Sequence, residues 1–331
     1  MDFTLKTYNK LLTALNNQGF LFLTFRDFVS DGSGKQLVLR HDVDSLPENS
    51  LQFAKIQADK GIMGTYYFRS VTETWNEEII RKIAEMGHEV GYHYEDLSFA
   101  WAKLKAQGFH LRSSSYGGQA GHHPSQGFGW QSRAQGEELK KMVVDIGIEL
   151  FKENLDKLRK IAPVKTICMH GRPMSRWDSR LLWKYYDYHD FGIIGEPYFD
   201  IDFDEVLYLT DTGRRWDGDF VSIRDKAQST ELRAQGGNPY KDWKVKPIKY
   251  RPDVNKNNVS PSPPLPLSLS SYRFHSTFDI IKAAEENKLP DKIMMTFHPQ
   301  RWTDKPLPWV KELVWQNVKN VGKYFLVKMR N

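Results

Sequence analysis

The sequence predicts an α/β fold built on parallel strands, arranged as an open sheet or as a barrel. Apolar strand candidates alternate with helix candidates, and three strands and two helices fall between residues 37 and 92. Several of the strands end in Asp or His, as expected where ligands gather at the carboxyl edge of a parallel sheet. With 331 residues, of which 40% are hydrophobic, the chain is long enough for a substantial core.

The first half of the chain reads as regular strand–helix alternation. Apolar residues at helical spacing predict a first helix, and Gly61 and Gly87 mark the ends of two later ones. Apolar runs of four to seven residues predict the strands. The expected elements are helix 3–15, strand 20–25, strand 37–40, helix 47–60, strand 62–68, helix 77–86 and strand 88–92.

The second half continues the pattern after a break. Leu, Ile, Val and Met recur along one side of a long helix that Pro163 ends. The expected elements are helix 137–161, strand 164–169, helix 178–186, strands 192–195 and 206–210, helix 277–288, strand 292–297 and helix 308–324.

Two irregular insertions interrupt one domain that spans 1–331. The first, at about 105–136, is rich in Gly, Ser, Gln and His, and the second covers about 225–275. Residues 228–271 hold seven of the sixteen prolines, too many for a helix or a central strand. The second insertion also carries +5 of the +6 net charge, so the charge belongs to a loop and we expect no nucleic-acid partner.

Composition further limits the function classes. The single Cys168 excludes an intramolecular disulfide and any Cys-rich zinc site. We find neither a secretory signal nor an apolar run long enough to span a membrane, so we expect a cytoplasmic protein. The oligomeric state cannot be read from the sequence.

The strand ends carry the candidate site. Asp42 and Asp44 are two residues apart after one strand and point the same way, while His93, His170 and His298 follow three others. Each alone reads as a capping Asp or an ordinary loop His, but parallel strands would bring them together. Asp and His ligands suit Zn²⁺ or a similar divalent ion, and a second Asp and His would supply base and acid.

These residues also carry a family resemblance. Arg40-His-Asp-Val-Asp44, Gly64-Thr-Tyr-Tyr-Phe68, Gly87-His-Glu-Val-Gly-Tyr-His93 and Phe297-His-Pro-Gln-Arg-Trp302 resemble the NodB-homology polysaccharide deacetylases. The similarity is greatest to the "RHDVD" branch found among bacterial surface-polysaccharide genes. It implies a distorted (β/α)7, TIM-like barrel, and the strands expected between 37 and 297 also number about seven.

The resemblance implies metal-assisted hydrolysis of an N-acetyl group. By position, Asp42 resembles the catalytic base, Asp44 a metal ligand, His93 the first histidine of an H-x-x-x-H ligand pair and His298 the general acid. In that mechanism the base removes a proton from a metal-activated water, and the acid protonates the leaving amine.

One family position is missing. Leu97 stands where the second ligand histidine is expected and cannot bind a metal. His170 and Glu95 are the candidates to replace it, and we favour His170 because Glu95 is so close to His93. The family arginine that orients the base has no clean match, so Arg172 is the stand-in, while Arg40 is expected to point sideways into the barrel or its rim.

The sequence therefore favours a metal-dependent deacetylase acting on a sugar or sugar precursor, either a small molecule or an oligosaccharide. Because of Leu97, a barrel that has lost hydrolysis and only binds a glycan or sugar nucleotide remains the alternative, with a hydrolase of a non-sugar amide as a third reading. The candidate substrate-binding residues are Glu95, Asp211, Trp216 and Trp302, although either Trp could instead pack on the barrel.

Overall fold

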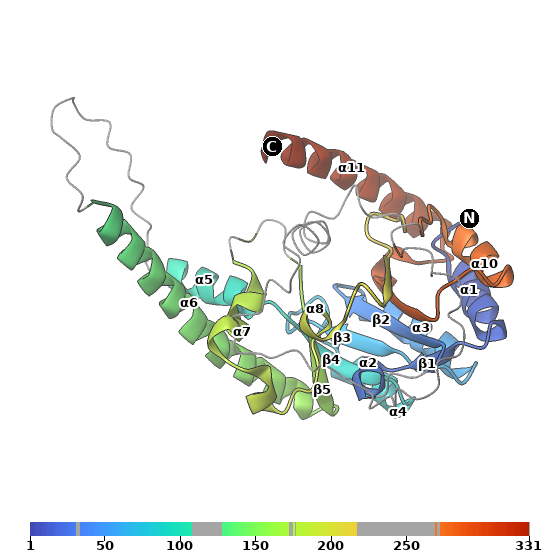
Figure 1. The fold of residues 1–331 in the computed structure, drawn as a ribbon, viewed down its shortest axis with the longest axis horizontal. Helices are drawn as coiled ribbons and strands as arrows, with labels where there is room; N and C mark the ends of the chain where they lie inside the picture. Colours follow the sequence, from blue (N-terminus) through green and yellow to red (C-terminus); the bar gives the residue numbers. More distant parts are fainter. Residues whose placement is uncertain are drawn as a thin grey trace, which may run out of the picture.

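The computed structural model shows a mixed α/β fold around one parallel sheet (Figure 1). It describes residues 1–30, 34–107, 128–171, 175, 177–216, 269 and 272–330, and within 128–135 and 320–330 it describes the backbone alone. The two predicted insertions fall largely on residues outside this description.

The sheet has seven strands, and every described pairing is parallel. Six strands follow the order β5-β4-β3-β2-β7-β6, and β1 pairs with the first residues of β2. An isolated parallel bridge joins Thr166 of β5 to Gly195. The strands are β1 (Leu21–Leu23), β2 (Gln36–Val43), β3 (Thr65–Phe68), β4 (Glu89–Tyr94), β5 (Val164–Met169), β6 (Leu207–Thr210) and β7 (Lys292–Phe297).

Helices flank the sheet, and α6 and α11 extend outward from it (Figure 1). The α-helices are α1 (Leu5–Asn17), α2 (Phe25–Ser30), α3 (Pro47–Ala58), α4 (Glu77–Glu85), α5 (Asp96–Ala106), α6 (Phe128–Arg159), α7 (Leu182–Tyr185), α8 (Pro197–Asp200), α10 (Thr277–Glu285) and α11 (Pro306–Arg330). Short 3₁₀ turns are η1 (Ser179–Leu181), η2 (Tyr188–Phe191) and η5 (Pro299–Arg301). In the described part of the chain, no helix is long and apolar enough to cross a membrane.

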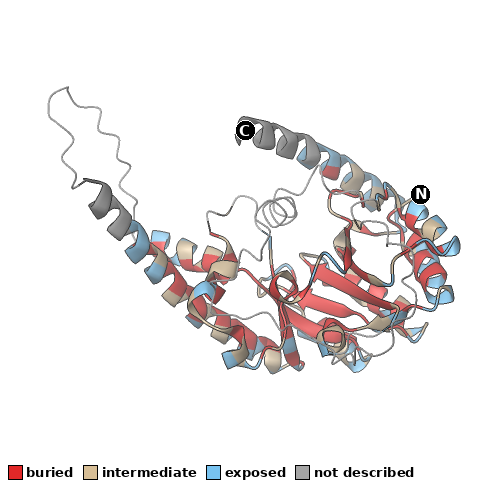
Figure 2. Ribbon diagram, in the orientation of Figure 1, coloured by how far each residue is buried: buried red, intermediate tan, exposed pale blue. Residues whose placement is uncertain are grey.

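Most strand residues are buried (Figure 2), and strand alternation divides their side chains between the two faces of the sheet. Along β2, Leu37, Leu39 and Val43 belong to the large core beneath the helices. Val38 belongs to a smaller cluster on the opposite face, which also contains Tyr67, Cys168 and Met294. Because side chains alternate along a strand, the residues that continue from Val38 share its face, and Arg40, Asp42 and Asp44 follow in that register.

The amino ends of the strands are closed by α2. The backbone N–H of Phe25 donates to Thr65 Oγ1 at 2.7 Å, and that of Arg26 donates to Glu89 Oε2 at 2.9 Å. Glu89 is buried, and burial raises the pKa of its carboxyl group. Since these contacts occupy the amino ends, the carboxyl ends of the strands are left for ligands.

Several predicted elements need correction. The predicted strand 192–195 is only the bridge at Gly195, because the chain enters a 3₁₀ turn and then α8 on either side of it. The predicted strand 20–25 shortens to β1, since Phe25 already begins α2. Helix α5 was not predicted, and it begins directly after β4 without a side-chain cap.

Candidate metal and proton-transfer site

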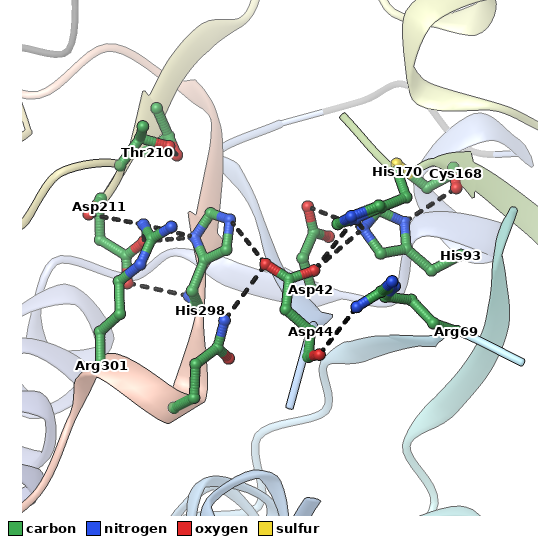
Figure 3. A network of polar contacts seen from close by, with 12 residues as sticks. Asp42, Asp44, Arg69, His93, Cys168, His170, Thr210, Asp211, His298 and Arg301 are labelled. Atoms are coloured by element: carbon green, nitrogen blue, oxygen red, sulfur yellow. Dashed lines mark hydrogen bonds and ion pairs between the residues drawn. The ribbon is translucent and has the colours of Figure 1, made fainter. Parts of the chain in front are cut away.

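The candidate site lies at the carboxyl ends of β2, β4, β5 and β7 (Figure 3). Asp42 lies near the end of β2, with Asp44 just beyond it, and His93 lies in β4. His170 and His298 directly follow β5 and β7. Four separate strand ends therefore bring these five side chains to one place, as the sequence predicted for parallel strands.

Asp44, His93 and His170 form a group that could hold a metal ion. His93 Nε2 lies 3.7 Å from Asp44 Oδ1 and 3.3 Å from His170 Nδ1, and His170 Nδ1 lies 3.1 Å from Asp44 Oδ1. A tetrahedral ion with ligands at about 2.0–2.1 Å separates its ligand atoms by roughly 3.3 Å. Buried Asp44 Oδ1 has no partner with hydrogen-bond geometry, so the three groups fit such an ion.

The protonation states also suit a cation. His93 Nδ1 lies 2.9 Å from the carbonyl oxygen of Cys168, so this nitrogen carries the proton and Nε2 presents its lone pair to the group. Burial lowers the pKa of His93 to about 4, which leaves the ring neutral at pH 7. Burial would raise the pKa of Asp44, but the imidazoles of His170, His298 and His93 hold it well below its usual value.

A second possible ligand group shares His93. Asp42, His93 and Cys168 also bring their ligand atoms together. Burial raises the pKa of the Cys168 thiol well above its usual value, and the protonated thiol is a poor metal ligand because metals bind the thiolate. Asp42 is in addition occupied by Arg40, so the group with Asp44 is the better metal site.

Arg40 holds Asp42 in a buried bidentate ion pair. Arg40 Nε donates to Asp42 Oδ1 at 2.8 Å, and Nη2 donates to Oδ2 at 2.6 Å. Burial would raise the pKa of Asp42, but the Arg40 guanidinium lowers it, so the carboxylate is ionised at neutral pH. Arg40 is buried on the face of the sheet that carries Asp42, and its pair with Asp42 was not predicted. Arg172, the predicted stand-in, lies outside the described residues.

His298 is held by a fully buried carboxylate. Its Nδ1 lies 2.5 Å from Asp211 Oδ1, and its backbone N–H donates to Oδ2 at 2.9 Å. Trp302 Nε1 donates to the same Oδ2 at 2.7 Å, and Arg301 Nη1 donates to Oδ1 at 3.0 Å. The carboxylate fixes the proton of His298 on Nδ1, and Nε2 faces Asp44 Oδ2 at 3.9 Å. His298 lies on the opposite side of Asp44 from the other two histidines (Figure 3).

The four predicted substrate-binding residues are buried. Asp211 is hydrogen-bonded to His298 through the ring and the backbone. Trp302 packs among Phe3, Tyr8, Phe53 and Phe297. Trp216 is also in the core, where its Nε1 donates to Thr277 Oγ1 at 2.9 Å. Glu95 forms a buried ion pair with Arg69. In the structure these residues pack in the core or support other side chains, and substrate binding by them stays a prediction.

Leu97 points away from the site. It is fully buried in the large core and packs so closely on α6 that a Cβ added at Gly147 would lie 2.5 Å from Leu97 Cδ2. His170, which follows the neighbouring strand β5, lies in the group of possible metal ligands that Leu97 does not join.

Two further residues at the site were not predicted. Gln300 Nε2 donates to Asp44 Oδ2 at 3.2 Å, and Arg69 Nη1 donates to the backbone oxygen of Asp44 at 3.0 Å. The Gln300 contact orients the Asp44 carboxylate, and the Arg69 contact holds the Asp44 backbone. The sequence signal for Gln300 was its place two residues after His298, but no pattern indicates which way a side chain in a 3₁₀ turn points.

The comparisons with known proteins add no name to this geometry. No protein-family model, no curated protein and no solved structure matches the chain.

Proposed function

We propose that this protein is a metal-dependent hydrolase that removes an acyl group, in the first place N-acetyl, from a sugar or sugar precursor. The observation that carries the proposal is one possible metal group flanked by two distinct proton-transfer residues. Asp42 lies on the His93 side, with Oδ2 3.7 Å from His93 Nε2, and His298 lies on the other side of Asp44.

Asp44, His93 and His170 would hold the ion, and zinc suits one carboxylate with two imidazoles. When bound, such an ion acts as a Lewis acid that polarises a carbonyl oxygen and lowers the pKa of a bound water. Its identity is part of the proposal.

The protein's own groups would move the protons. Asp42 is ionised and held by Arg40, so it can accept a proton from the attacking water. His298 would deliver a proton from Nε2 to the leaving nitrogen, while Asp211 keeps Nδ1 protonated and stabilises the positive ring. Water adds to the acyl carbon, the C–N bond breaks, and the products are a free amine and a carboxylic acid.

The choice of a sugar amide rests on the motifs that resemble the NodB-homology deacetylases. The parallel sheet is compatible with their distorted (β/α)7 barrel, which we include in the proposal. Leu97 cannot bind a metal, but His170, from the neighbouring strand, could supply the third ligand in its place. This favours hydrolysis over a barrel that only binds a glycan.

The first test is metal content. Wild type is purified without chelator, supplied with Zn²⁺ and dialysed, beside Asp44→Ala, His93→Ala and His170→Ala, and the bound metal is measured by mass spectrometry. His189→Ala is the matched control, because His189 lies outside the site, where its Nδ1 is 2.6 Å from Asp187 Oδ1. We expect metal in wild type and the control only. No metal in wild type after zinc is supplied would exclude the mechanism.

The second test is acyl release from a panel of N-acetylated sugars and nucleotide sugars. Asp42→Asn is expected to retain the metal and to lose turnover. A metal-loaded wild type that binds members of the panel without releasing acetate would favour the alternative of a glycan-binding barrel.

A further inference from the structure

The outer face of α11 is an exposed apolar stripe. Leu307, Val310, Val314 and Val318 are 83%, 50%, 57% and 57% exposed, and they recur at i, i+3, i+7 and i+11 along one side of the helix. Trp315, at the edge of this stripe, is 53% exposed. The other exposed large hydrophobic side chains in the described residues are scattered singly, so this stripe is unusual.

The opposite face of α11 is already used for packing. Trp309 Nε1 donates to the backbone oxygen of Asp2 at 2.7 Å, and Arg214 Nη1 donates to the backbone oxygen of Trp309 at 3.2 Å. The Arg214 guanidinium also lies 4.7 Å from the Trp309 ring centre, and Gln316 is buried. These contacts fix the rotation of the helix, so the apolar stripe lies on the side of α11 opposite to them, and α11 itself extends outward from the sheet (Figure 1).

The charge of α11 indicates what covers the stripe. The sequence of Pro306–Arg330 contains five Lys or Arg residues and one Glu. Among the described side chains, Lys311 lies next to the stripe in the helical spacing, and Lys319 Nζ lies 4.9 Å from the Trp315 ring centre. An amphipathic helix with an apolar face, a Trp and an excess of positive charge suits the surface of an anionic bilayer.

We propose that the outer face of α11 binds the surface of a membrane that contains anionic lipids. The helix lies in the interface and does not cross it, in keeping with the absence of a membrane-spanning helix among the described residues. The excess of positive charge opposes pairing with α11 of a second copy, because two such helices would repel each other. This inference does not depend on the proposed hydrolase activity.

The test is co-sedimentation of the full chain with vesicles of phosphatidylcholine alone or mixed with phosphatidylglycerol. We expect binding to the mixed vesicles that weakens as salt is added. Val314→Asp with Val318→Asp should weaken binding at least about tenfold, because each change replaces an apolar contact with a negative charge. Lys311→Glu should weaken it by a similar factor and leave the stripe intact.

Phe278→Asp is the matched control, because Phe278 is also an exposed apolar side chain, at 44%, but lies on α10. All of the variants change exposed residues, and circular dichroism and thermal melting check that they fold. Equal binding of wild type and the Val314/Val318 variant would overturn the proposal, as would no binding to mixed vesicles. A concentration-dependent dimer in sedimentation velocity, abolished by the Val314/Val318 variant, would assign the stripe to a second copy.

Discussion

Replacing Asp211 with Asn tests whether this buried carboxylate is the anchor of His298. Four donor groups converge on its two oxygens, from the ring and backbone of His298, from Arg301 and from Trp302. An Asn side chain has one acceptor oxygen, and its amide group would face donors, so at least one buried N–H loses its partner.

The size of the effect follows from the pKa of Asp211. Burial would raise it, but His298 and Arg301 lower it from 3.8 to about 2. The difference corresponds to about 2 kcal/mol of stability at neutral pH. Because the folded-state pKa is the lower one, this contribution is fully present above about pH 4, falls as the pH drops toward 2, and is about half lost near pH 3.

We therefore expect Asp211→Asn to lower the free energy of unfolding at pH 7 by about 2–4 kcal/mol, the upper part arising from the unpaired donor. The difference from wild type should narrow as the pH falls below 4. Urea unfolding of both proteins between pH 7 and pH 3, followed by circular dichroism, measures it.

Asp187→Asn provides the control. Asp187 also lies 2.6 Å from a histidine nitrogen, that of His189, but both side chains are about one-third exposed. Its loss should change the free energy of unfolding by less than about 1 kcal/mol. The reasoning would be refuted if Asp211→Asn matched this control at pH 7, or if its effect did not shrink in acid.

Three further predictions follow from the same site. Arg40→Ala leaves Asp42 buried without its guanidinium partner, and should lower the free energy of unfolding in urea by about 3–5 kcal/mol. Lys82→Ala breaks an exposed pair with Glu78 and should change the free energy of unfolding far less. Equal effects would contradict the buried pair. Gln300→Leu removes the donor to Asp44 and should weaken zinc binding about tenfold in a chelator-competition titration. The control Gln52→Leu, at an exposed position, should leave zinc affinity unchanged. Unchanged zinc affinity in Gln300→Leu would show that Gln300 does not act on the site. Leu97→His places a polar ring in the core and should lower stability by about 2–5 kcal/mol without adding bound zinc, so a gain of metal in that variant would show that position 97 faces the site.

The strands were predictable because each is an apolar run, and alternation fixes which residues share a face. Asp42 and Asp44 were placed together on this ground alone. The same rule puts Arg40 on the face of Asp42, two residues earlier, so the Arg40–Asp42 pair could have been found from the sequence. The resemblance instead indicated Arg172 for this role.

Other features depend on tertiary contacts that no local pattern carries. The burial of Asp211 requires Trp302 and Arg301 to approach from beyond β7, some ninety residues later in the chain. Trp302 itself looked equally suited to stacking on a sugar, since an aromatic side chain serves in either role. Helix α5 lacks a capping side chain, so no capping pattern in the sequence indicates where it begins.

The proposed third ligand, His170, comes from a neighbouring strand and not from the position four residues after His93. A ligand four residues after His93 would have to come from the first turn of α5, but that turn directs Leu97 into the core. In the register of β4 and β5, His93 lies beside Cys168, and His170 is two residues further along, on the same face as Cys168. The two histidines of the possible ligand group thus come from neighbouring strands, and their relative position depends on the pairing of β4 with β5. Changes that weaken this pairing should therefore weaken metal binding, even where they touch none of the three ligands.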